Sequence, residues 1–310
     1  MHPRIGFAGF GEVGFCMGKG FKAEGIPQVL AYSNGATNRP PYTPAFRKKA
    51  ADAGVELVDT LEKLVGRSDV IFSVVVPSNA LAVAREAAAY IQERHFYVDM
   101  NSCSPAIKQE AAALIQPSGA TYVDGIIARD QGEQSGMLHV TVALHRVHIL
   151  MASEGGEAFK RLMDPYRMDI VLTGGGPGTV AMAKMIRSIL TKGRRALLWE
   201  AAIAAWKSGV DVEALQKDVF PPFEVNLPKF LQQVPHIESF WSVLHNARRS
   251  QEALEVAETL KSLGVEPIMA IAASARLDWT KGFNMEKAFP DSPPADYREL
   301  LEAIEAQLAK

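Results

Sequence analysis

The sequence predicts an α/β protein: a Rossmann-type, doubly wound parallel sheet followed by an all-α C-terminal domain, linked by a long helix. Three observations predict this class. Short β-branched runs alternate with Ala-rich helical patterns up to about residue 173, the pattern of a parallel sheet covered by helices. After that point only helical patterns follow. A glycine-rich turn also follows the first strand directly, as in dinucleotide-binding domains.

Eight short runs rich in Val, Ile, Phe and Tyr are expected to form strands. They lie at residues 4–10, 28–33, 55–58, 69–77, 95–101, 121–127, 139–144 and 168–174. From Gly178 to Gly209 the pattern is one long helix, and the later stretch "RRSQEALEVAETLKSLG" is typical of an amphipathic helix. The change from alternating strand and helix patterns to helical patterns alone places the domain boundary between residues 173 and 174. This gives domains 1–173 and 174–310.

Composition and charge limit the classes of partner. The chain has 310 residues, of which 48% are hydrophobic and 22% charged, which suits two globular domains with a sizeable core. A net charge of −2 gives no electrostatic reason to expect nucleic acid or an anionic membrane. We therefore expect a small-molecule partner. The N-terminus lacks a targeting pattern and no apolar run is long enough to span a bilayer, so the expected location is the cytoplasm.

No metal site is expected. The two cysteines, Cys16 and Cys103, lie far apart without the CxxC spacing of a zinc site, and a disulfide framework is not expected either. His139, His145 and His148 flank a predicted strand without a recognisable ligand set, so we interpret them as structural.

The motif "GFGEVG" comes directly after the first predicted strand and opens a helix. Gly9 permits the tight turn, Gly11 lets the backbone approach a pyrophosphate, and Gly14 lets the helix lie close to the strand. A merely structural turn is the alternative, but the strand-turn-helix context favours a dinucleotide. The expected cofactor-binding residues are Gly9, Phe10, Gly11, Glu12, Val13 and Gly14.

The end of the second strand favours NADP, with NAD as the alternative. An NAD site carries an acidic side chain there for the adenosine ribose. This chain has Ser33 and Asn34, with Arg39 close by, and no carboxylate in that stretch. These three side chains can donate hydrogen bonds to a 2′-phosphate, which a carboxylate would repel. They can also be ordinary polar loop residues.

Two further loops follow predicted strands at the edge where ligands of doubly wound folds bind. The stretch "VVVPSNA" contributes Val76 and Pro77, and "DMNSCSP" contributes Asn101 and Ser102. We expect Val76, Pro77 and Asn101 to contact the cofactor, and Ser102 to contact the substrate.

With these motifs the chain resembles the 6-phosphogluconate dehydrogenase and β-hydroxyacid dehydrogenase superfamily. The resemblance rests on "GFGEVG", "VVVP", "VDMNSCSP" and the glycine-rich segment "GGGPG" at 174–178, which precedes a lysine-bearing helix. It spans nearly the whole chain. The stretch "HNARRSQEALEVAETLKSLGVEP" is more similar to a bacterial phosphogluconate-dehydrogenase-like branch whose helical C-terminal domain has no assigned function. The resemblance implies an NADP-binding first domain, a helical substrate and dimerisation domain, and hydride transfer between NADP and a small hydroxy or oxo compound carrying an acidic group.

The resemblance also implies a role for Lys184, which stands where the family carries a general acid/base near the start of the interdomain helix. Removing hydride from a carbon that bears a hydroxyl requires a group that takes the hydroxyl proton, and a partly desolvated lysine can be tuned toward neutral pH for this. The alternative is a solvated polar stripe, because residues 184, 188, 191 and 195 share one helical face.

The chain departs from the family pattern at two places. Ser188 stands where relatives carry Asn, and "ARD" at 128–130 replaces the Ser-Gly-Gly run that holds a substrate carboxylate. The second departure puts a simple β-hydroxyacid substrate in doubt. Arg129 is a candidate replacement for the lost anion donors, with a surface residue as the alternative. His245 and Arg248 are candidates to close the site, with an ordinary polar helix face as the alternative.

Two alternative functions and a homodimer complete the expectations. Imine reduction is one alternative, since related folds alter the acid/base position. A regulatory protein that binds NADP without turnover is the other. A homodimer is expected because the apolar face of "LLWEAAIAAW" at 197–206 calls for a partner. The sequence does not identify the substrate or the direction of hydride transfer.

Overall fold

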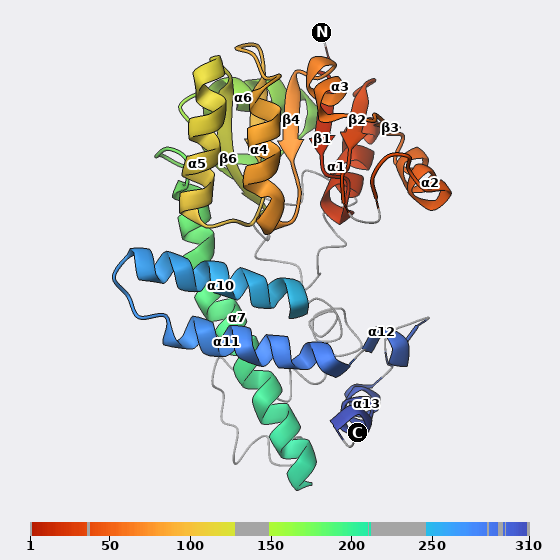
Figure 1. The fold of residues 1–310 in the computed structure, drawn as a ribbon, viewed down its shortest axis with the longest axis vertical. Coiled ribbons are helices and arrows are strands. Elements are labelled where there is room, and N and C mark those ends of the chain that lie inside the picture. The colour runs from red at the N-terminus through yellow and green to blue at the C-terminus, as the bar shows by residue number, and fades with distance from the viewer. Residues whose placement is uncertain are drawn as a thin grey trace. The chain divides into compact units, whose positions relative to one another are not determined.

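The computed structural model describes residues 2–35, 38–127, 149–209, 211, 246–283, 285–290, 294 and 296–308. The chain forms two compact units, residues 1–184 and 185–310, which are described separately below (Figure 1). They meet inside the long helix α7 (Thr179–Ser208), whereas the sequence places the boundary at residue 173. The expected long helix from Gly178 to Gly209 is confirmed.

The first unit is built on an eight-stranded sheet of order β3-β2-β1-β4-β5-β6-β7-β8. Its strands are β1 (Ile5–Ala8), β2 (Val29–Tyr32), β3 (Glu56–Leu57), β4 (Val70–Ser73), β5 (Phe96–Asp99), β6 (Thr121–Ile127), β7 (Ile149–Ala152) and β8 (Ile170–Leu172). The strands β1 to β6 pair in parallel, and the strand order reverses direction at β1, between β2 and β4. This arrangement confirms the predicted Rossmann-type class.

One strand was not predicted, and one predicted strand lies outside the described residues. The stretch 139–144 is not described, whereas β7 lies at Ile149–Ala152. Its pairing with β6 is antiparallel, so the sheet is not parallel throughout. The sequence of β7, "ILMA", has no period-two alternation and contains good helix formers, so only its burial in the sheet makes it a strand.

Helices cover both faces of the sheet, which explains why the strands are apolar on both sides. One face packs Phe7 and Phe72, with ring centroids 5.5 Å apart, under α1 (Glu12–Ala23), α2 (Pro44–Asp52) and α6 (Gly156–Met163). The other packs the stacked rings of Tyr97 and Tyr122 under α3 (Leu61–Gly66), α4 (Ala80–Ala88) and α5 (Pro105–Ile115). Short 3-10 turns lie at Pro77–Asn79, Gln116–Ser118 and Asp164–Tyr166.

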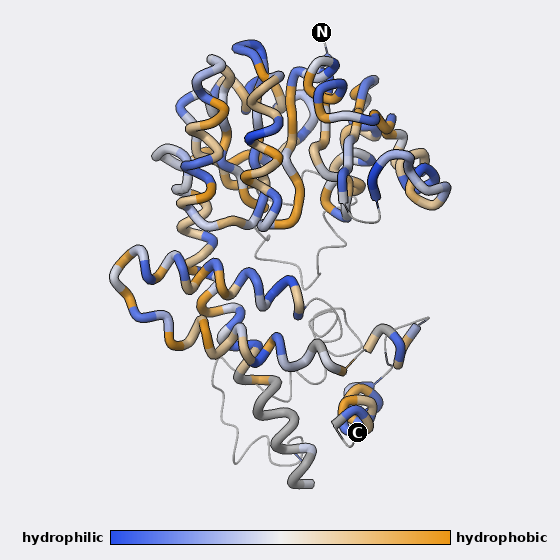
Figure 2. The backbone as a smooth tube through the Cα atoms, viewed as in Figure 1, coloured by the Kyte–Doolittle hydropathy of each residue, from blue (hydrophilic) through white to orange (hydrophobic). Residues whose placement is uncertain are grey.

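The described part of the second unit is helical. Beyond α7 it contains α10 (Asn246–Ser262), α11 (Ile268–Trp279), a 3-10 turn at Thr280–Phe283, α12 (Met285–Ala288) and α13 (Tyr297–Leu308). Met185 of α7 packs against Val256 of α10 and Ala270 of α11. Hydrophilic and hydrophobic residues alternate along α10 (Figure 2), whereas α11 also exposes Ile268, Met269 and Ile271. No described helix is long and apolar enough to cross a bilayer.

His95 gives the first unit a pH-dependent stability. Its side chain lies in the turn before β5, 1% exposed, and its Nδ1 accepts a hydrogen bond from the Gln92 N–H at 2.8 Å. Burial, and then the positive charge of Arg94, lower the pKa of His95 below its ordinary value of 6.5. Because the unfolded chain binds this proton more readily, the free energy of unfolding should fall as pH drops below 6.5.

We predict that His95→Gln flattens this dependence. Urea denaturation of both proteins at about pH 7.5 and about pH 5 measures it, with the loss of stability on acidification smaller in the variant. Equal losses in the two proteins would show that His95 contributes nothing to the acid sensitivity.

Candidate functional site

The glycine-rich turn has the geometry that the motif predicts. Gly9 has φ +100°, and a Cβ there would lie 2.5 Å from the carbonyl oxygen of Val74, so only glycine fits. A Cβ on Gly14 would lie 2.9 Å from the carbonyl oxygen of Gly9, which keeps α1 close to β1. Gly11, the N-cap of α1, is exposed, and a Cβ there would meet nothing within 4 Å. The turn therefore leaves open space at the position where a phosphate would approach.

The end of β2 lies beside this turn. The Gly9 N–H donates to the carbonyl oxygen of Tyr32 at 2.8 Å, and Ser33 follows directly. The Ser33 N–H donates to the hydroxyl of Tyr42 at 3.2 Å, which fixes the start of the loop. Asn34 and Arg39 are exposed in the same loop. The structure therefore places the start of the predicted 2′-phosphate contact region next to the glycine turn.

Asn101 connects the loops after β4 and β5. Its side chain is buried; its Oδ1 accepts a hydrogen bond from the Val75 N–H at 2.7 Å, and its Nδ2 donates to Ser73 Oγ at 2.9 Å and to Asp99 Oδ1 at 2.8 Å. These bonds hold the loop in which Val76 is exposed and Pro77 is buried. A direct contact between Asn101 and a cofactor stays a prediction, and the bonds give this residue a positioning role.

Ser102 is the next residue along. Its Oγ is buried and has no hydrogen-bond partner among the described residues. A buried hydroxyl without a partner costs free energy, about 1–3 kcal/mol, unless a ligand or water satisfies it. A contact between Ser102 and a substrate stays a prediction.

A buried charge network that the sequence motifs do not indicate lies at the same edge. Lys108 Nζ is 2.9 Å from Asp99 Oδ1 and 3.3 Å from Asp124 Oδ1, with all three side chains at most 1% exposed. The Tyr122 hydroxyl donates to Asp99 Oδ2 at 2.9 Å. The sequence does carry a signal: residues 105, 108, 111, 112 and 115 form the buried stripe of α5, and Lys108 is the one charged residue among them.

Burial and charge act in opposite directions on this network. Burial raises the pKa of Asp124, and the neighbouring Lys108 charge acts against that rise. Burial by itself would lower the pKa of Lys108, but the charges of Asp99 and then Asp124 raise it above its ordinary value. Lys108 is therefore held as an ammonium ion between carboxyl groups.

The glycine-rich segment at 174–178 brings the start of α7 into contact with this network. Gly178 has φ +93°, and a Cβ there would lie 3.1 Å from the carbonyl oxygen of Pro105 at the start of α5. The Gly178 N–H donates to Asp124 Oδ2 at 2.9 Å, and the Ala181 N–H donates to the same oxygen at 3.4 Å. Asp124 thus caps the N-terminus of α7, and half-buried Lys184 follows in the second turn.

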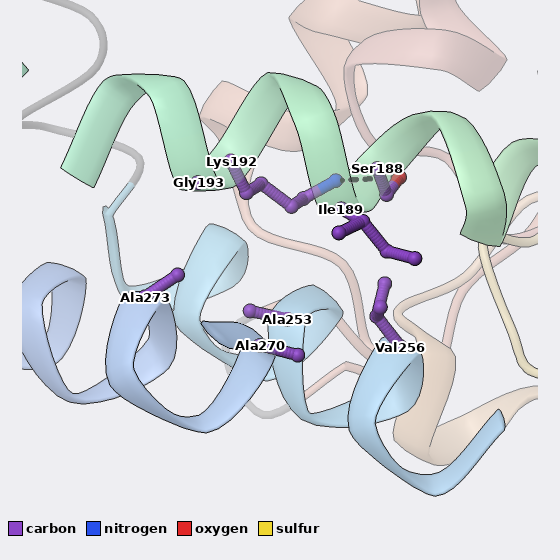
Figure 3. A pocket seen from close by; sticks show the side chains of 8 residues that line it. All are labelled: Ser188, Ile189, Lys192, Gly193, Ala253, Val256, Ala270 and Ala273. Carbon is purple, nitrogen blue, oxygen red and sulfur yellow. Dashed lines mark hydrogen bonds between the residues drawn. The ribbon is translucent and has the colours of Figure 1, made fainter. Parts of the chain in front are cut away.

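In the second unit the structure links two of the predicted substrate residues. Ser188 is buried, and its Oγ accepts a hydrogen bond from Lys192 Nζ at 3.0 Å (Figure 3). Lys192 Nζ lies 3.0 Å from Glu252 Oε2, and Arg248 Nε lies 3.6 Å from Glu252 Oε1. Burial lowers the pKa of Lys192, although Glu252 acts against that effect.

The remaining candidates are placed as follows. Arg129 and His245, together with His139, His145 and His148, lie outside the described residues. Both cysteines, Cys16 and Cys103, are buried and form no disulfide. Burial raises the pKa of Cys16 to about 11, which keeps it as an unreactive thiol.

Comparisons with known proteins agree with this geometry. Residues 4–146 match the sequence model of the NAD binding domain of 6-phosphogluconate dehydrogenase. An uncharacterized 28.5 kDa protein of Methanothermus fervidus is 28% identical over 268 residues, which cover 86% of this chain and 94% of the relative.

Two of the similar solved structures each cover 99% of this chain. A conserved hypothetical protein from Sinorhizobium meliloti 1021 is 26% identical, with a TM-score of 0.66 and coverage of 99% of this chain and 97% of that one. The 3-hydroxyisobutyrate dehydrogenase of Mycobacterium tuberculosis, solved with L-serine, is 17% identical, with a TM-score of 0.63 and coverage of 99% of both chains. The latter likeness is one of fold. The glycine turn of the first unit therefore lies within the stretch that matches an NAD binding domain.

We predict that Gly11→Ala weakens dinucleotide binding without unfolding the protein. The added methyl group points into open space in the protein, so the free energy of unfolding should change by no more than about 1 kcal/mol. The same methyl group should obstruct the pyrophosphate and raise the Kd at least about tenfold.

Gly66→Ala is the matched control, because a Cβ at this last residue of α3 also meets nothing within 4 Å. Its Kd should stay within about threefold of wild type. Fluorescence titration measures both, and equal affinity of the Gly11→Ala protein would place the dinucleotide away from this turn.

Proposed function

We propose that the chain is a member of the 6-phosphogluconate dehydrogenase and β-hydroxyacid dehydrogenase superfamily and that it is an NADP-dependent oxidoreductase acting on a small hydroxy or oxo compound with an acidic group. The match of residues 4–146 to the NAD binding domain of 6-phosphogluconate dehydrogenase supports this. One observation carries the inference. Asp124 binds the start of α7, the helix that bears Lys184. Lys184 and the glycine turn belong to the same compact unit. An amine that can exchange a proton and a dinucleotide turn in one unit are the parts that hydride transfer at an alcohol carbon requires.

The cofactor supplies hydride acceptance or donation by its nicotinamide ring when it is bound. The open space at Gly11 and the close packing at Gly9 and Gly14 fit its pyrophosphate. Ser33, Asn34 and Arg39 favour the 2′-phosphate of NADP, because that loop carries donors and no carboxylate. NAD is the alternative.

Lys184 has the role of general acid/base in this proposal. In the oxidation, its neutral Nζ takes the proton of the substrate hydroxyl as the hydride leaves the carbon. In the reduction, its ammonium form returns the proton to the carbonyl oxygen. Ser102 Oγ, a buried hydroxyl without a described partner, supplies a hydrogen bond to a polar group of the substrate. Ser188, one turn after Lys184 on α7, and Arg248 are the further substrate candidates.

Two alternatives stay open, and one panel of compounds separates them. An imine reductase would turn over cyclic imines in preference to hydroxyacids and ketones. A regulatory protein would bind NADPH and turn over none of them. The retention of Lys184 favours hydroxyl chemistry, since an imine nitrogen presents no hydroxyl proton to remove.

The homodimer also stays a proposal. Besides the stretch 197–206, α7 carries Ile186 and Leu190, whose exposed fractions are 54% and 73%. These positions are one helical turn apart and form a small apolar surface of the kind that subunit contacts cover.

We predict that NADPH binds at least about tenfold more tightly than NADH, and that Arg39→Ala removes most of this preference. Arg85→Ala is the control, because Arg85 is an exposed arginine of α4 whose ion pair with Glu110 is long, at 3.9 Å. Fluorescence titration of both cofactors measures the ratio. Equal or tighter binding of NADH to the wild-type protein would refute the NADP assignment.

We predict that Lys184→Met lowers turnover by about 10² to 10⁴-fold while NADPH binding and folding are retained, because methionine keeps the length and helix propensity and removes the proton. The exposed Arg187 on the same helix provides the control Arg187→Met, which should keep turnover within about threefold. Steady-state kinetics on the best compound of the panel measures both. Turnover of the Lys184→Met protein near the wild-type rate would assign the proton to another group.

A further inference from the structure

The buried network at the sheet edge contains more negative than positive charge. Asp99 and Asp124 lie opposite each other in neighbouring strands β5 and β6, and Lys108 of α5 reaches both. The Lys108 ammonium also donates to the carbonyl oxygen of Asp99 at 2.6 Å. One ammonium offsets only one of the two carboxylate charges, so the other needs compensation from dipoles.

The N-terminus of α7 supplies that compensation. Asp124 Oδ2 accepts the Gly178 N–H at 2.9 Å and the Ala181 N–H at 3.4 Å, and these belong to the amide groups that a helix start leaves without intrahelical partners. The partial positive charge of a helix N-terminus also favours a carboxylate there. Asp124 and α7 therefore hold each other in place.

The same network holds the loop after β4. Asp99 Oδ1 accepts hydrogen bonds from the Asn101 N–H and from Asn101 Nδ2, at 2.9 and 2.8 Å. The other end of that amide, Oδ1, accepts the Val75 N–H at 2.7 Å. A continuous chain of hydrogen bonds and ion pairs thus runs from Val75 through Asp99, Lys108 and Asp124 to the first turn of α7.

We propose that Asp124, oriented by Lys108 and Asp99, is a positioning residue for Lys184: it sets the place and direction of the first turns of α7 relative to the loop after β4. The inference rests on the role proposed for Lys184. Lys184 lies three residues after Ala181, within one helical turn of an amide that Asp124 binds. A shift of this turn by about 1 Å moves the lysine Nζ by a similar distance, which is enough to slow proton transfer by about 10²-fold.

The first test is Asp124→Asn. The amide keeps the shape and one acceptor oxygen and leaves Lys108 paired with Asp99 alone, a neutral pair, so we expect the variant to fold. Hydrogen exchange of the amides at 178–184 should become about five- to tenfold faster, because a neutral acceptor caps the helix less well. The kcat should fall about 10 to 10²-fold while the Kd for NADPH stays unchanged.

Asp69→Asn is the matched control for a general loss of stability. Asp69 lies just before β4, at the amino end of the parallel strands, where it pairs with Arg4. Asp99 lies at the carboxyl end of β5. This variant loses a charged hydrogen-bonded partner in the same unit and should change neither the exchange of residues 178–184 nor the kcat.

A second pair of variants tests the cap from the helix side without changing charge. Gly178→Ala places a Cβ 3.1 Å from the Pro105 carbonyl oxygen at positive φ, and Gly176→Ala meets nothing within 4 Å. Only the first should accelerate exchange at 178–184 and lower kcat, and this pair decides the question if Asp124→Asn does not fold.

The outcomes separate this inference from the proposed function. Unchanged exchange at 178–184, or a kcat that falls no further than in Asp69→Asn, overturns the positioning role even when Lys184→Met is inactive. Full turnover by Lys184→Met instead overturns the proposed function, and the positioning role with it, whatever the exchange shows.

Discussion

The buried ion pair between Lys108 and Asp99 is the interaction on which the edge of the sheet depends. Burying three ionisable groups costs several kcal/mol for each before their attraction is counted, and removing one partner of such a pair typically costs about 3–5 kcal/mol. The cost is offset because almost every polar atom has a partner: Tyr122 and Asn101 on Asp99, and the Gly178 N–H on Asp124. The network is therefore stable only in one arrangement of β5, β6, α5 and the start of α7.

This constraint explains why a glycine stands directly before α7. A helix that begins at Thr179 must bring its first amides to a carboxylate buried in β6, and the backbone of α5 lies in the way. Gly178 solves the problem with positive φ and without a Cβ beside Pro105. Among the glycines that precede α7, Gly178 is therefore the one that close approach to α5 requires. Lys184 follows at a place determined by the first unit, although most of α7 belongs to the second.

The sequence was sufficient to predict the parts of this fold that local chemistry determines. The turn after β1 could be predicted because Gly9 and Gly14 of "GFGEVG" each meet a separate steric demand. The helix α7 could be predicted from its unbroken helical pattern. The strand β7 could not, because "ILMA" has no strand periodicity and depends on its neighbours β6 and β8. Asn101 was assigned to the cofactor on its loop position, yet its amide is engaged by Ser73, Val75 and Asp99, which only the fold brings together.

Stability by itself does not account for the residue types at this edge. Buried ion pairs can often be replaced by packed apolar side chains of similar volume with no loss, or a gain, of about 1–4 kcal/mol. Three apolar side chains in place of Asp99, Lys108 and Asp124 would fill the space between α5 and the sheet. They would not determine the direction in which α7 begins. Hydrogen bonds to a carboxylate are directional over tenths of an ångström, whereas apolar contacts permit sliding. The three polar side chains are thus explained by the need to position one element accurately. That element is α7, the helix that carries Lys184.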